Sequence, residues 1–328
     1  MIYDCVIVGG GAGGLSSALM LGRARRNVLL LTAGLPRNAP AEQAHSLFTR
    51  DGTPPLELVR IGMEQLQPYT TVHPVENARV VSLAHDKEAK MFYIEYQNES
   101  NANAGGFSIM MTAQVEEPKP LIRVTARGVI LATGVRDVLP PIAGIEQFWG
   151  KSVIHCPYCH GFEHADKRFA YMGSIGPMAV MALQLLRGSW AQDVVWLQNG
   201  GTPALTAEQL ARLKELNVTI YDKKVAEFRG DDAGNVQTVV FEDGTTLDRD
   251  CILIHPDNKP NTDSIELKDG FSYKIMHTDT MDIILKGQTD VPGLYLVGDL
   301  ATPLHQLSTA AYLGGFMAGS LNMYLSTL

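Results

Sequence analysis

The apolar residues of this chain fall into short continuous runs separated by segments of helical periodicity. Residues 2–8 form the first run, which ends at a cluster of glycines. Apolar and small side chains then recur at helical spacing from Leu15 to Gly22, and residues 28–31 form a second run. A continuous apolar run is typical of a strand buried on both faces. A strand, a helix and a second strand in this order predict a βαβ unit of a parallel sheet, and therefore an α/β fold.

The same alternation returns in the middle of the chain. Residues 169–172 predict a buried strand, residues 173–177 a glycine loop, residues 178–186 an apolar helix and residues 194–197 the returning strand. A further helix is expected to begin after Thr206, because a glutamine three residues later gives the spacing of a capping box. The two βαβ units indicate an internal duplication.

Two stretches are expected to lie outside this regular pattern. Residues 37–55 are rich in proline and polar side chains and predict a loop. Residues 97–119 begin polar and end charged, which favours an extended hairpin or a mobile insertion. Between them, residues 56–66 predict a helix and residues 79–96 predict antiparallel strands.

The order of the elements predicts how the domains are arranged. The pair Pro140-Pro141 breaks the chain and marks a crossing from one domain to the next. Residues 294–297 form a last buried run, which is interpreted as a strand that returns to the N-terminal sheet. We therefore expect an α/β protein of two Rossmann-like three-layer domains. One comprises residues 1–143 and 255–328, and the other is inserted as residues 144–254.

Composition narrows the classes of function. The chain has 328 residues, 45% of them hydrophobic and 19% charged, which is enough apolar material for large cores. Its formal net charge of -8 argues against a nucleic-acid-binding surface. It has no run of about 18 apolar residues that would span a membrane. The first strand begins at Ile2, and the four cysteines do not make a disulfide scaffold. We therefore expect a cytoplasmic protein.

The glycine cluster after the first strand carries a dinucleotide-binding signature. The pattern GxGxxG is in register at Gly9, Gly11 and Gly14, between a predicted strand and a predicted helix. In this pattern the glycines permit a tight turn, close approach of a pyrophosphate, and close packing of helix on strand. The second strand ends in Thr32-Ala33, where an acidic residue normally binds the ribose hydroxyls, so Thr32 is expected to bind a hydroxyl more weakly. The candidate residues for the dinucleotide are Gly9, Gly11, Ala12, Gly13, Gly14 and Thr32.

The strongest chemical signal is the motif Cys156-Pro157-Tyr158-Cys159. Two thiols at this spacing can close a small, reversible disulfide, and in a cytosolic protein such a motif is more often catalytic or metal-binding than a structural bridge. A redox pair is the favoured interpretation. Unpaired core cysteines are a second interpretation. A zinc half-site is a third interpretation, in which His155, His160 or His164 would add a ligand to the two cysteines. Structural zinc usually needs a second ligand pair, so no metal is expected.

Three further residues bear on the thiol chemistry: a histidine beside the motif and the two remaining cysteines. His160 follows the second cysteine and is a candidate for exchanging a proton with a thiol, although it can equally serve as a helix cap. Cys5 and Cys251 lie inside apolar strands and are expected to be inert core residues.

The glycine loop of the second βαβ unit is a damaged version of the first. Gly176 and Ala179 fit a GxGxxA pattern, whereas Ser174 replaces its first glycine. The strand that follows ends in the sequence QNGG, without an acid for an NADH ribose or an arginine cluster for the 2'-phosphate of NADPH. We expect the fold of a nucleotide site with a weakened signature. Its candidate residues are Ser174, Gly176, Pro177 and Met178.

Four segments together make the chain resemble the thioredoxin reductase family of low-molecular-weight flavoproteins. They read VIVGGGAGG, GVILATGVRDVLPPIAGIEQFWG, HCPYCHGFE and VPGLYLVGDLATPLHQLSTAAYLGG, and the resemblance spans the chain apart from residues 97–119. It implies an FAD domain in two pieces, an inserted domain that carries the redox CxxC, and a homodimer. It also implies the residues that lie against FAD: Ala132, Thr133, Gly134 and Gly298, with Asp299 at the ribitol and His305 and Gln306 near the isoalloxazine ring.

Within that family, the segments PRNAP, RDGTPP and CPYCHGFE are most similar to a branch that includes the dithiol oxidases of gliotoxin and holomycin biosynthesis. Ordinary thioredoxin reductases carry an acid after the second cysteine, whereas this chain has His160 there, as in that branch. The resemblance implies that Cys159 is the thiol next to the flavin and that Cys156 is the exchanging thiol.

The predicted function is an FAD-dependent dithiol/disulfide oxidoreductase that passes two electrons between flavin and a substrate disulfide through Cys156 and Cys159. The substrate is expected to be a thioredoxin-like protein or a small-molecule dithiol or disulfide. The electron partner and the direction of flow stay open, with NADPH, oxygen, ferredoxin or a second flavin in the inserted domain as the alternatives. The rival functions are a thioredoxin reductase-like protein that does not use NADPH and a non-catalytic FAD-binding redox sensor.

Overall fold

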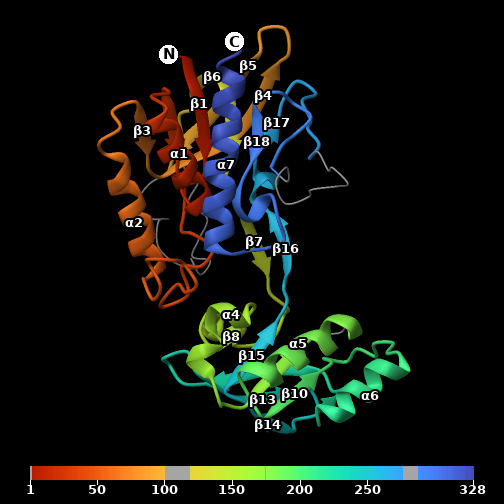
Figure 1. The fold of residues 1–328 in the computed structure, drawn as a ribbon. Coiled ribbons are helices and arrows are strands. Elements are labelled where there is room, and N and C mark those ends of the chain that lie inside the picture. Colours follow the sequence, from red (N-terminus) through yellow and green to blue (C-terminus); the bar gives the residue numbers. More distant parts are fainter. Residues whose placement is uncertain (1, 100–118, 174, 276–286) are drawn as a thin grey trace. The chain divides into compact units, whose positions relative to one another are not determined.

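The structure is a computed structural model that describes residues 2–99, 119–173, 175–275 and 287–328 (Figure 1). Most of the predicted insertion at 97–119, and Ser174 of the second glycine loop, lie outside the described residues. The chain divides into two compact units. Unit 1 comprises Met1–Ala39, Leu47–Arg136 and Lys259–Leu328, and unit 2 comprises Pro40–Ser46 and Asp137–Asn258.

Unit 1 is built on a mixed sheet in the order β17-β4-β5-β6-β1-β2-β3, with β18 also paired to β6. Strands β1, β2, β3, β6 and β18 are mutually parallel, whereas β5 is antiparallel to both β4 and β6. The strands are β1 (Ile2–Val8), β2 (Val28–Leu31), β3 (Val72–Val75), β4 (Ala78–Asp86), β5 (Met91–Asn98), β6 (Ile122–Leu131), β17 (Glu266–Leu267) and β18 (Leu294–Leu296).

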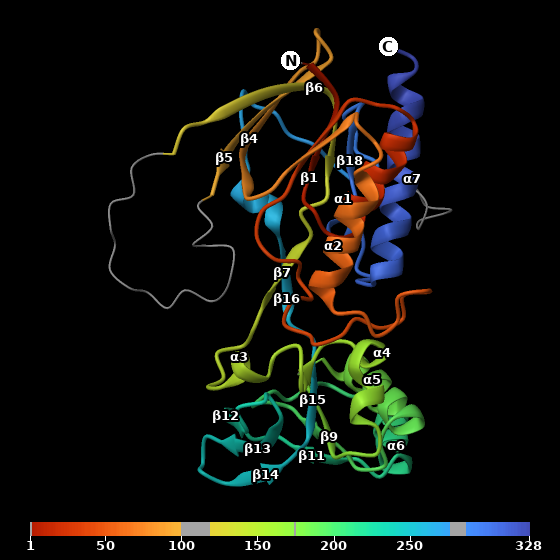
Figure 2. The same cartoon turned by 90° about the vertical axis from the view of Figure 1, so that its left-hand side faces the viewer.

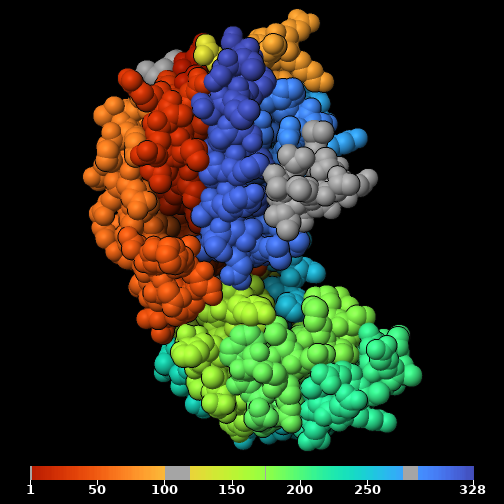
Figure 3. Space-filling model, viewed as in Figure 1, coloured from red at the N-terminus to blue at the C-terminus, as the bar shows by residue number. Residues whose placement is uncertain are grey.

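Helices α1 (Ala12–Arg23), α2 (Pro55–Leu66) and α7 (Leu307–Leu325) cover one face of the parallel strands (Figure 2). Short 3-10 turns lie at η3 (Asn261–Ser264) and η4 (Gly298–Leu300). Helix α7 runs beside α1 along the surface of unit 1 (Figure 3). The buried Ser17 hydroxyl joins the two helices, because it lies 2.9 Å from the Gly13 carbonyl oxygen and 3.0 Å from that of Gly314.

Unit 2 contains a wholly parallel sheet in the order β11-β10-β9-β15-β8 and a separate antiparallel sheet β12-β13-β14. Helices α5 and α6 lie on one side of the parallel sheet and the antiparallel strands on the other (Figure 2). The strands are β8 (Val153–Ile154), β9 (Phe169–Met172), β10 (Val194–Leu197), β11 (Thr219–Tyr221), β12 (Val225–Gly230), β13 (Val236–Phe241), β14 (Thr246–Asp248) and β15 (Cys251–Ile254). The helices are α3 (Ile145–Phe148), α4 (Pro157–His160), η2 (Phe162–His164), α5 (Gly176–Ser189) and α6 (Ala207–Glu215).

The chain passes between the two units four times, after residues 39, 46, 136 and 258. The last two passages run through β7 (Val135–Val138) and β16 (Asp257–Pro260), which pair with each other. The first two enclose residues 40–46, which are far in sequence from the rest of unit 2 but belong to it. Among the described residues, no helix is long and apolar enough to cross a membrane.

The elements expected from the apolar pattern are confirmed. The strands at residues 2–8, 28–31, 169–172 and 194–197 have the predicted bounds. The last predicted strand pairs with β6 in the sheet of unit 1, which brings the C-terminal part of the chain back to the N-terminal fold. The α/β class with Rossmann-like layers follows from this topology.

Candidate active site

The turn between β1 and α1 can be built only with glycine at two positions. Gly9 has a φ of 114°, in the region that side chains rarely adopt, and a Cβ there would overlap the carbonyl oxygen of Ala132. A Cβ on Gly14 would overlap the Gly9 carbonyl oxygen, so the first turn of α1 packs directly on the end of β1. This is the packing that the GxGxxG pattern predicts.

The space in front of this turn is suited to a dinucleotide. A Cβ on Gly11 would meet nothing within 4 Å, and α1 begins there without a side chain that caps its first amides. Such an uncapped helix N-terminus has backbone N–H groups suited to a pyrophosphate. The Thr133 hydroxyl after β6 is buried and has no hydrogen-bond partner among the described residues. An open cradle and an orphaned hydroxyl both fit FAD, and Gly134 beside them is equally unobstructed.

The other residues expected at the flavin are carried by unit 1 as well. The Thr32 side chain follows β2 and packs against Gly10 of the glycine turn. Gly298 and Asp299 form η4 at the end of β18, and the Gly298 nitrogen lies 3.3 Å from the position of a Cβ on Gly13. Gln306 is the N-cap residue of α7, and His305 precedes it.

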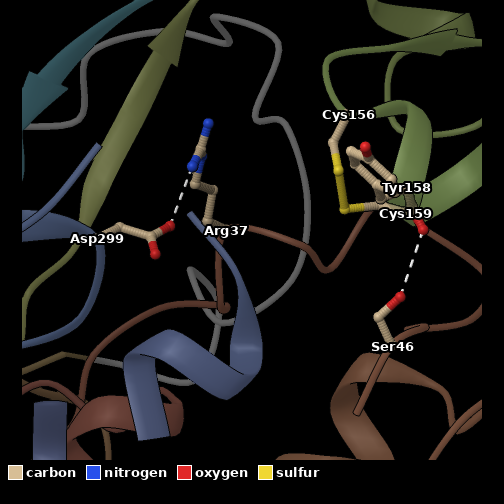
Figure 4. Close-up of a disulfide and its surroundings, with 6 residues drawn as sticks. All are labelled: Arg37, Ser46, Cys156, Tyr158, Cys159 and Asp299. Carbon is tan, nitrogen blue, oxygen red and sulfur yellow. Dashed lines mark hydrogen bonds and ion pairs between the residues drawn. A yellow bond between two sulfur atoms is a disulfide. The ribbon is translucent and has the colours of Figure 1, made fainter. Parts of the chain in front are cut away.

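One residue at this end of unit 1, Arg37, has no signal in the sequence. The Arg37 guanidinium forms a salt bridge of 3.0 Å with the Asp299 carboxylate, and both side chains are largely buried (Figure 4). Arg37 lies in the loop after β2, which the sequence predicts as a polar loop and nothing more. Its partner stands 262 positions away, so no local pattern signals the pair.

In unit 2, Cys156 and Cys159 are joined by a disulfide at the start of α4 (Figure 4). Cys156 is the N-cap residue of this short helix, and Pro157 begins it without an amide to satisfy. The Cys159 amide donates to the Cys156 carbonyl at 3.2 Å, which closes the turn that brings the two sulfurs together. The redox-pair interpretation of the motif is supported by this bond. Among the described residues, no group of three or more His, Cys, Asp or Glu side chains is arranged to hold a metal ion.

His160 ends the same helix in an unusual electrostatic setting. Both ring nitrogens are covered, and neither has a hydrogen-bond partner among the described residues. Burial lowers the pKa of His160 to about 4, although the Glu163 carboxylate acts in the opposite direction. The imidazole is therefore neutral at physiological pH and retains an acceptor nitrogen, on the residue that follows Cys159 in the chain.

The segment 40–46 packs beside this redox turn within unit 2. The His45 ring lies 3.3 Å from the Glu163 carboxylate, and the Ser46 hydroxyl donates to the Tyr158 carbonyl at 3.5 Å (Figure 4). Two large apolar side chains next to the disulfide are open to solvent: Tyr158 is 62% exposed and Phe162 is 82% exposed. The turn therefore presents an apolar surface to solvent.

The second glycine loop differs from the first in the place where a pyrophosphate would lie. Gly176 occupies the position that corresponds to Gly11, but a Cβ there would meet the Leu205 Cδ2 at 2.7 Å and the Ala204 carbonyl oxygen at 2.9 Å. The loop before α6 thus fills the space that is open in unit 1. Pro177 and Met178 belong to the first turn of α5. After β10, the Asn199 side chain accepts a hydrogen bond from the Val225 amide at 2.8 Å instead of facing a ligand. These residues do not fit a conventional pyridine nucleotide.

The two other cysteines are free and buried. Cys5 in β1 and Cys251 in β15 are both fully inaccessible to solvent, and burial raises the pKa of each thiol. Both therefore stay protonated and unreactive, as the apolar strands around them predicted.

Comparisons with known proteins agree with this site. Residues 3–315 match the family described as pyridine nucleotide-disulphide oxidoreductase. The chain is 27% identical to the thioredoxin reductase tcpT of Claviceps purpurea, over 98% of this chain and 93% of that protein. It is 27% identical to a probable thioredoxin reductase of Arthroderma benhamiae, over 90% of this chain and 74% of that protein.

A solved structure of an oxidoreductase from Agrobacterium tumefaciens has the same fold, with a TM-score of 0.80 and 27% identity over 100% of this chain and 99% of that one. The resemblance, the fold class and the class of enzyme expected from the motifs are thereby confirmed. With a glycine turn that fits FAD and a disulfide in a CxxC turn, the chain belongs to the pyridine nucleotide-disulphide oxidoreductase family, as a thioredoxin reductase-like flavoenzyme.

Proposed function

We propose that this enzyme is an FAD-dependent dithiol/disulfide oxidoreductase in which Cys156 and Cys159 carry two electrons between flavin and a substrate disulfide. The observation that carries the proposal is the Cys156–Cys159 disulfide, placed at the start of α4 beside the exposed Tyr158 and Phe162. A structural bridge has no need of exposed aromatic side chains beside it; Cys156 itself is only 9% exposed, so the substrate reaches its sulfur past these side chains. A non-catalytic redox sensor is the weaker candidate for the same reason.

FAD would be held by unit 1, which we propose as the flavin domain. The amides at the start of α1 would bind the pyrophosphate, and Gly11 and Gly134 leave room for the dinucleotide. The Thr133 hydroxyl would find in FAD the hydrogen-bond partner that it lacks among the described residues. When bound, FAD supplies the two-electron donor or acceptor for the cysteine pair.

The cysteine pair exchanges with substrate through a mixed disulfide. A substrate thiolate attacks the Cys156 sulfur, the Cys156–Cys159 bond breaks, and Cys159 leaves as a thiolate. The second substrate thiolate then attacks the substrate sulfur of the mixed disulfide, which releases the substrate disulfide and the Cys156 thiolate. The substrate has lost two electrons and the enzyme pair has gained them. The same steps in reverse reduce a substrate disulfide.

His160 is proposed to move protons in this exchange. A dithiol that becomes a disulfide releases two protons, and the neutral imidazole of His160, the residue after Cys159, has a nitrogen that can accept one. Because burial lowers the pKa of His160 to about 4, the imidazole does not retain a proton at neutral pH and passes it on. It acts in this role where ordinary members of the family carry an acid.

The substrate is a dithiol or disulfide, of a thioredoxin-like protein or of a small molecule, and relative turnover with each distinguishes the two. The resemblance also leads us to expect a homodimer, and the cysteine usage leads us to expect a cytoplasmic protein.

The test is an anaerobic visible spectrum of the purified protein, recorded before and after addition of a small dithiol such as dithiothreitol. We expect about one FAD per chain, bleached by the dithiol in wild type and in the control Cys251→Ala, which removes only a buried thiol. Cys156→Ser should retain flavin but lose the rapid bleaching. Full disulfide turnover by Cys156→Ser would contradict the mechanism.

A second candidate concerns the electron partner. The filled space in front of Gly176 supports a thioredoxin reductase-like enzyme that does not take electrons from NADPH. Oxygen, ferredoxin or a second flavin would replace it. The measurement is anaerobic titration of the flavin with NADPH and with NADH. No bleaching by either, in protein that a dithiol does bleach, is expected; stoichiometric bleaching by NADPH would show that the loop before α6 opens for the nucleotide.

A further inference from the structure

Arg37 joins two parts of unit 1 that meet at the proposed flavin site. It lies in the loop after β2, and its Nη1 stands 3.0 Å from the Oδ2 of Asp299, after β18 (Figure 4). The two side chains are 15% and 21% exposed. A pair so well covered is less screened by solvent than an ion pair on the surface. The charges of Arg37 and Asp299 therefore act strongly on groups close to them.

The pair lies close to the N-terminus of α1. The Gly298 nitrogen, one residue before Asp299, is 3.3 Å from the position of a Cβ on Gly13 in the first turn of α1. That turn has no acidic residue and no capping side chain. Asp299 therefore directly follows a residue whose backbone packs on the turn whose amides would receive the pyrophosphate of FAD.

This arrangement poses a charge problem. The pyrophosphate of a dinucleotide is anionic, and a carboxylate nearby repels it in a partly buried site. The N-terminus of a helix contributes only about half a positive charge. The loop that supplies Arg37 brings a full positive charge to the carboxylate.

We propose that Arg37 is a flavin-binding residue, which neutralises Asp299 and thereby allows a carboxylate to stand beside the pyrophosphate of FAD. The inference rests on the proposed function, because it concerns the same flavin. Arginine suits this position better than lysine, since its planar guanidinium has five N–H donors and can hold the carboxylate while it faces a phosphate oxygen.

The experiment measures FAD affinity without measuring activity. Flavin is removed from the purified protein, and FAD is titrated back with the quenching of its fluorescence as readout, for wild type, Arg37→Gln, Asp299→Asn and the double variant. We expect Arg37→Gln to weaken FAD binding about ten- to a hundredfold, as for a lost charge-assisted contact. The decisive result is the double variant. If Arg37 neutralises Asp299, the change Asp299→Asn in the Arg37→Gln background should restore part of the affinity.

Arg127→Gln is the matched control. Arg127 also pairs with an aspartate in unit 1, Asp4 at 3.5 Å, but this pair is more exposed and remote from the flavin turn. It should bind FAD as wild type does. Arg37→Lys keeps the charge and is expected to bind FAD more tightly than Arg37→Gln. The thermal midpoint of each flavin-free variant shows whether it is folded. If Arg37→Gln does not fold, the FAD affinity of Arg37→Lys is compared with that of wild type instead.

Three results would overturn the inference: wild-type affinity in Arg37→Gln, no restoration by Asp299→Asn in the double variant, or an Arg37→Lys as weak as Arg37→Gln. These are distinct from failure of the proposed function. If wild type binds no FAD, both proposals are overturned. If wild type binds FAD and Arg37→Gln binds it equally tightly, only the role of Arg37 is overturned.

Discussion

Burial of His160 should make unit 2 sensitive to acid, and His160→Gln should remove much of that sensitivity. The pKa of His160 is lowered by burial from an ordinary 6.5 to about 4. Between these values the unfolded chain binds a proton at this position and the folded chain does not. The free energy of unfolding therefore falls as the pH drops through this window, and it is fully retained above it.

The size of the effect follows from the two pKa values. A shift of this extent corresponds to about 3 kcal/mol once the pH is below both values. Between about pH 7 and about pH 5, the part contributed by His160 is roughly 2 kcal/mol. Glutamine is uncharged at both pH values, so His160→Gln should lower the difference between the free energies of unfolding at these pH values by that amount.

The tryptophans make the assay specific to the right unit. The chain has three, Trp149, Trp190 and Trp196, and all lie within the Asp137–Asn258 part of unit 2. Urea unfolding followed by tryptophan fluorescence at the two pH values therefore reports this unit. His73→Gln, an exposed histidine of unit 1, is the control for the substitution itself and should leave the pH dependence unchanged. If His160→Gln keeps the full wild-type difference, the imidazole is not held neutral by burial, and its proposed role as a neutral proton acceptor falls with it.

Three further changes test the framework around the sites. Thr206→Ala removes the capping box at the start of α6, where the Thr206 hydroxyl accepts from the Gln209 amide at 3.2 Å, and should cost about 1 kcal/mol in the same urea assay. Ser152→Ala leaves the Val236 amide, now 2.8 Å from the buried Ser152 hydroxyl, without that acceptor, and should cost about 1–3 kcal/mol. Gly14→Ala places a methyl group on the Gly9 carbonyl oxygen of the glycine turn, so the purified protein should contain little flavin. The visible absorbance of the protein measures the flavin content. Wild-type flavin content would mean that the turn yields more easily than its packing indicates.

The framework of both units was predictable because its signals are local. The apolar run at residues 28–31 and the glycines at 9 and 14 act on neighbours a few positions away, so their pattern survives in the sequence. The Cys156–Cys159 pair is equally local, because the bonded residues are three positions apart. Such features require no knowledge of which distant segments meet.

The remaining features of the sites depend on distant segments and could not be predicted. Residues 40–46 join unit 2 although they are more than a hundred positions from the redox turn, and nothing in their composition indicates that His45 will meet Glu163. Arg37 and Asp299 are separated still further. The composition of the loop after β2 predicts only a connection. Its polar residues are what a solvated loop would also contain, so composition alone does not reveal a contact.

The comparison of Gly11 with Gly176 shows why a motif and a site are different things. Both glycines follow a buried parallel strand, Gly11 as the N-cap residue of α1 and Gly176 as the first residue of α5, and the sequence places them in the same position of the same pattern. What distinguishes them is a side chain from elsewhere: nothing stands within 4 Å of a Cβ on Gly11, whereas Leu205 stands 2.7 Å from one on Gly176. A βαβ unit is stabilised by its own strand and helix packing, which does not depend on a nucleotide. The second unit can therefore keep its fold after its cradle has been filled. The redox turn is the feature of unit 2 on which the proposed substrate exchange rests.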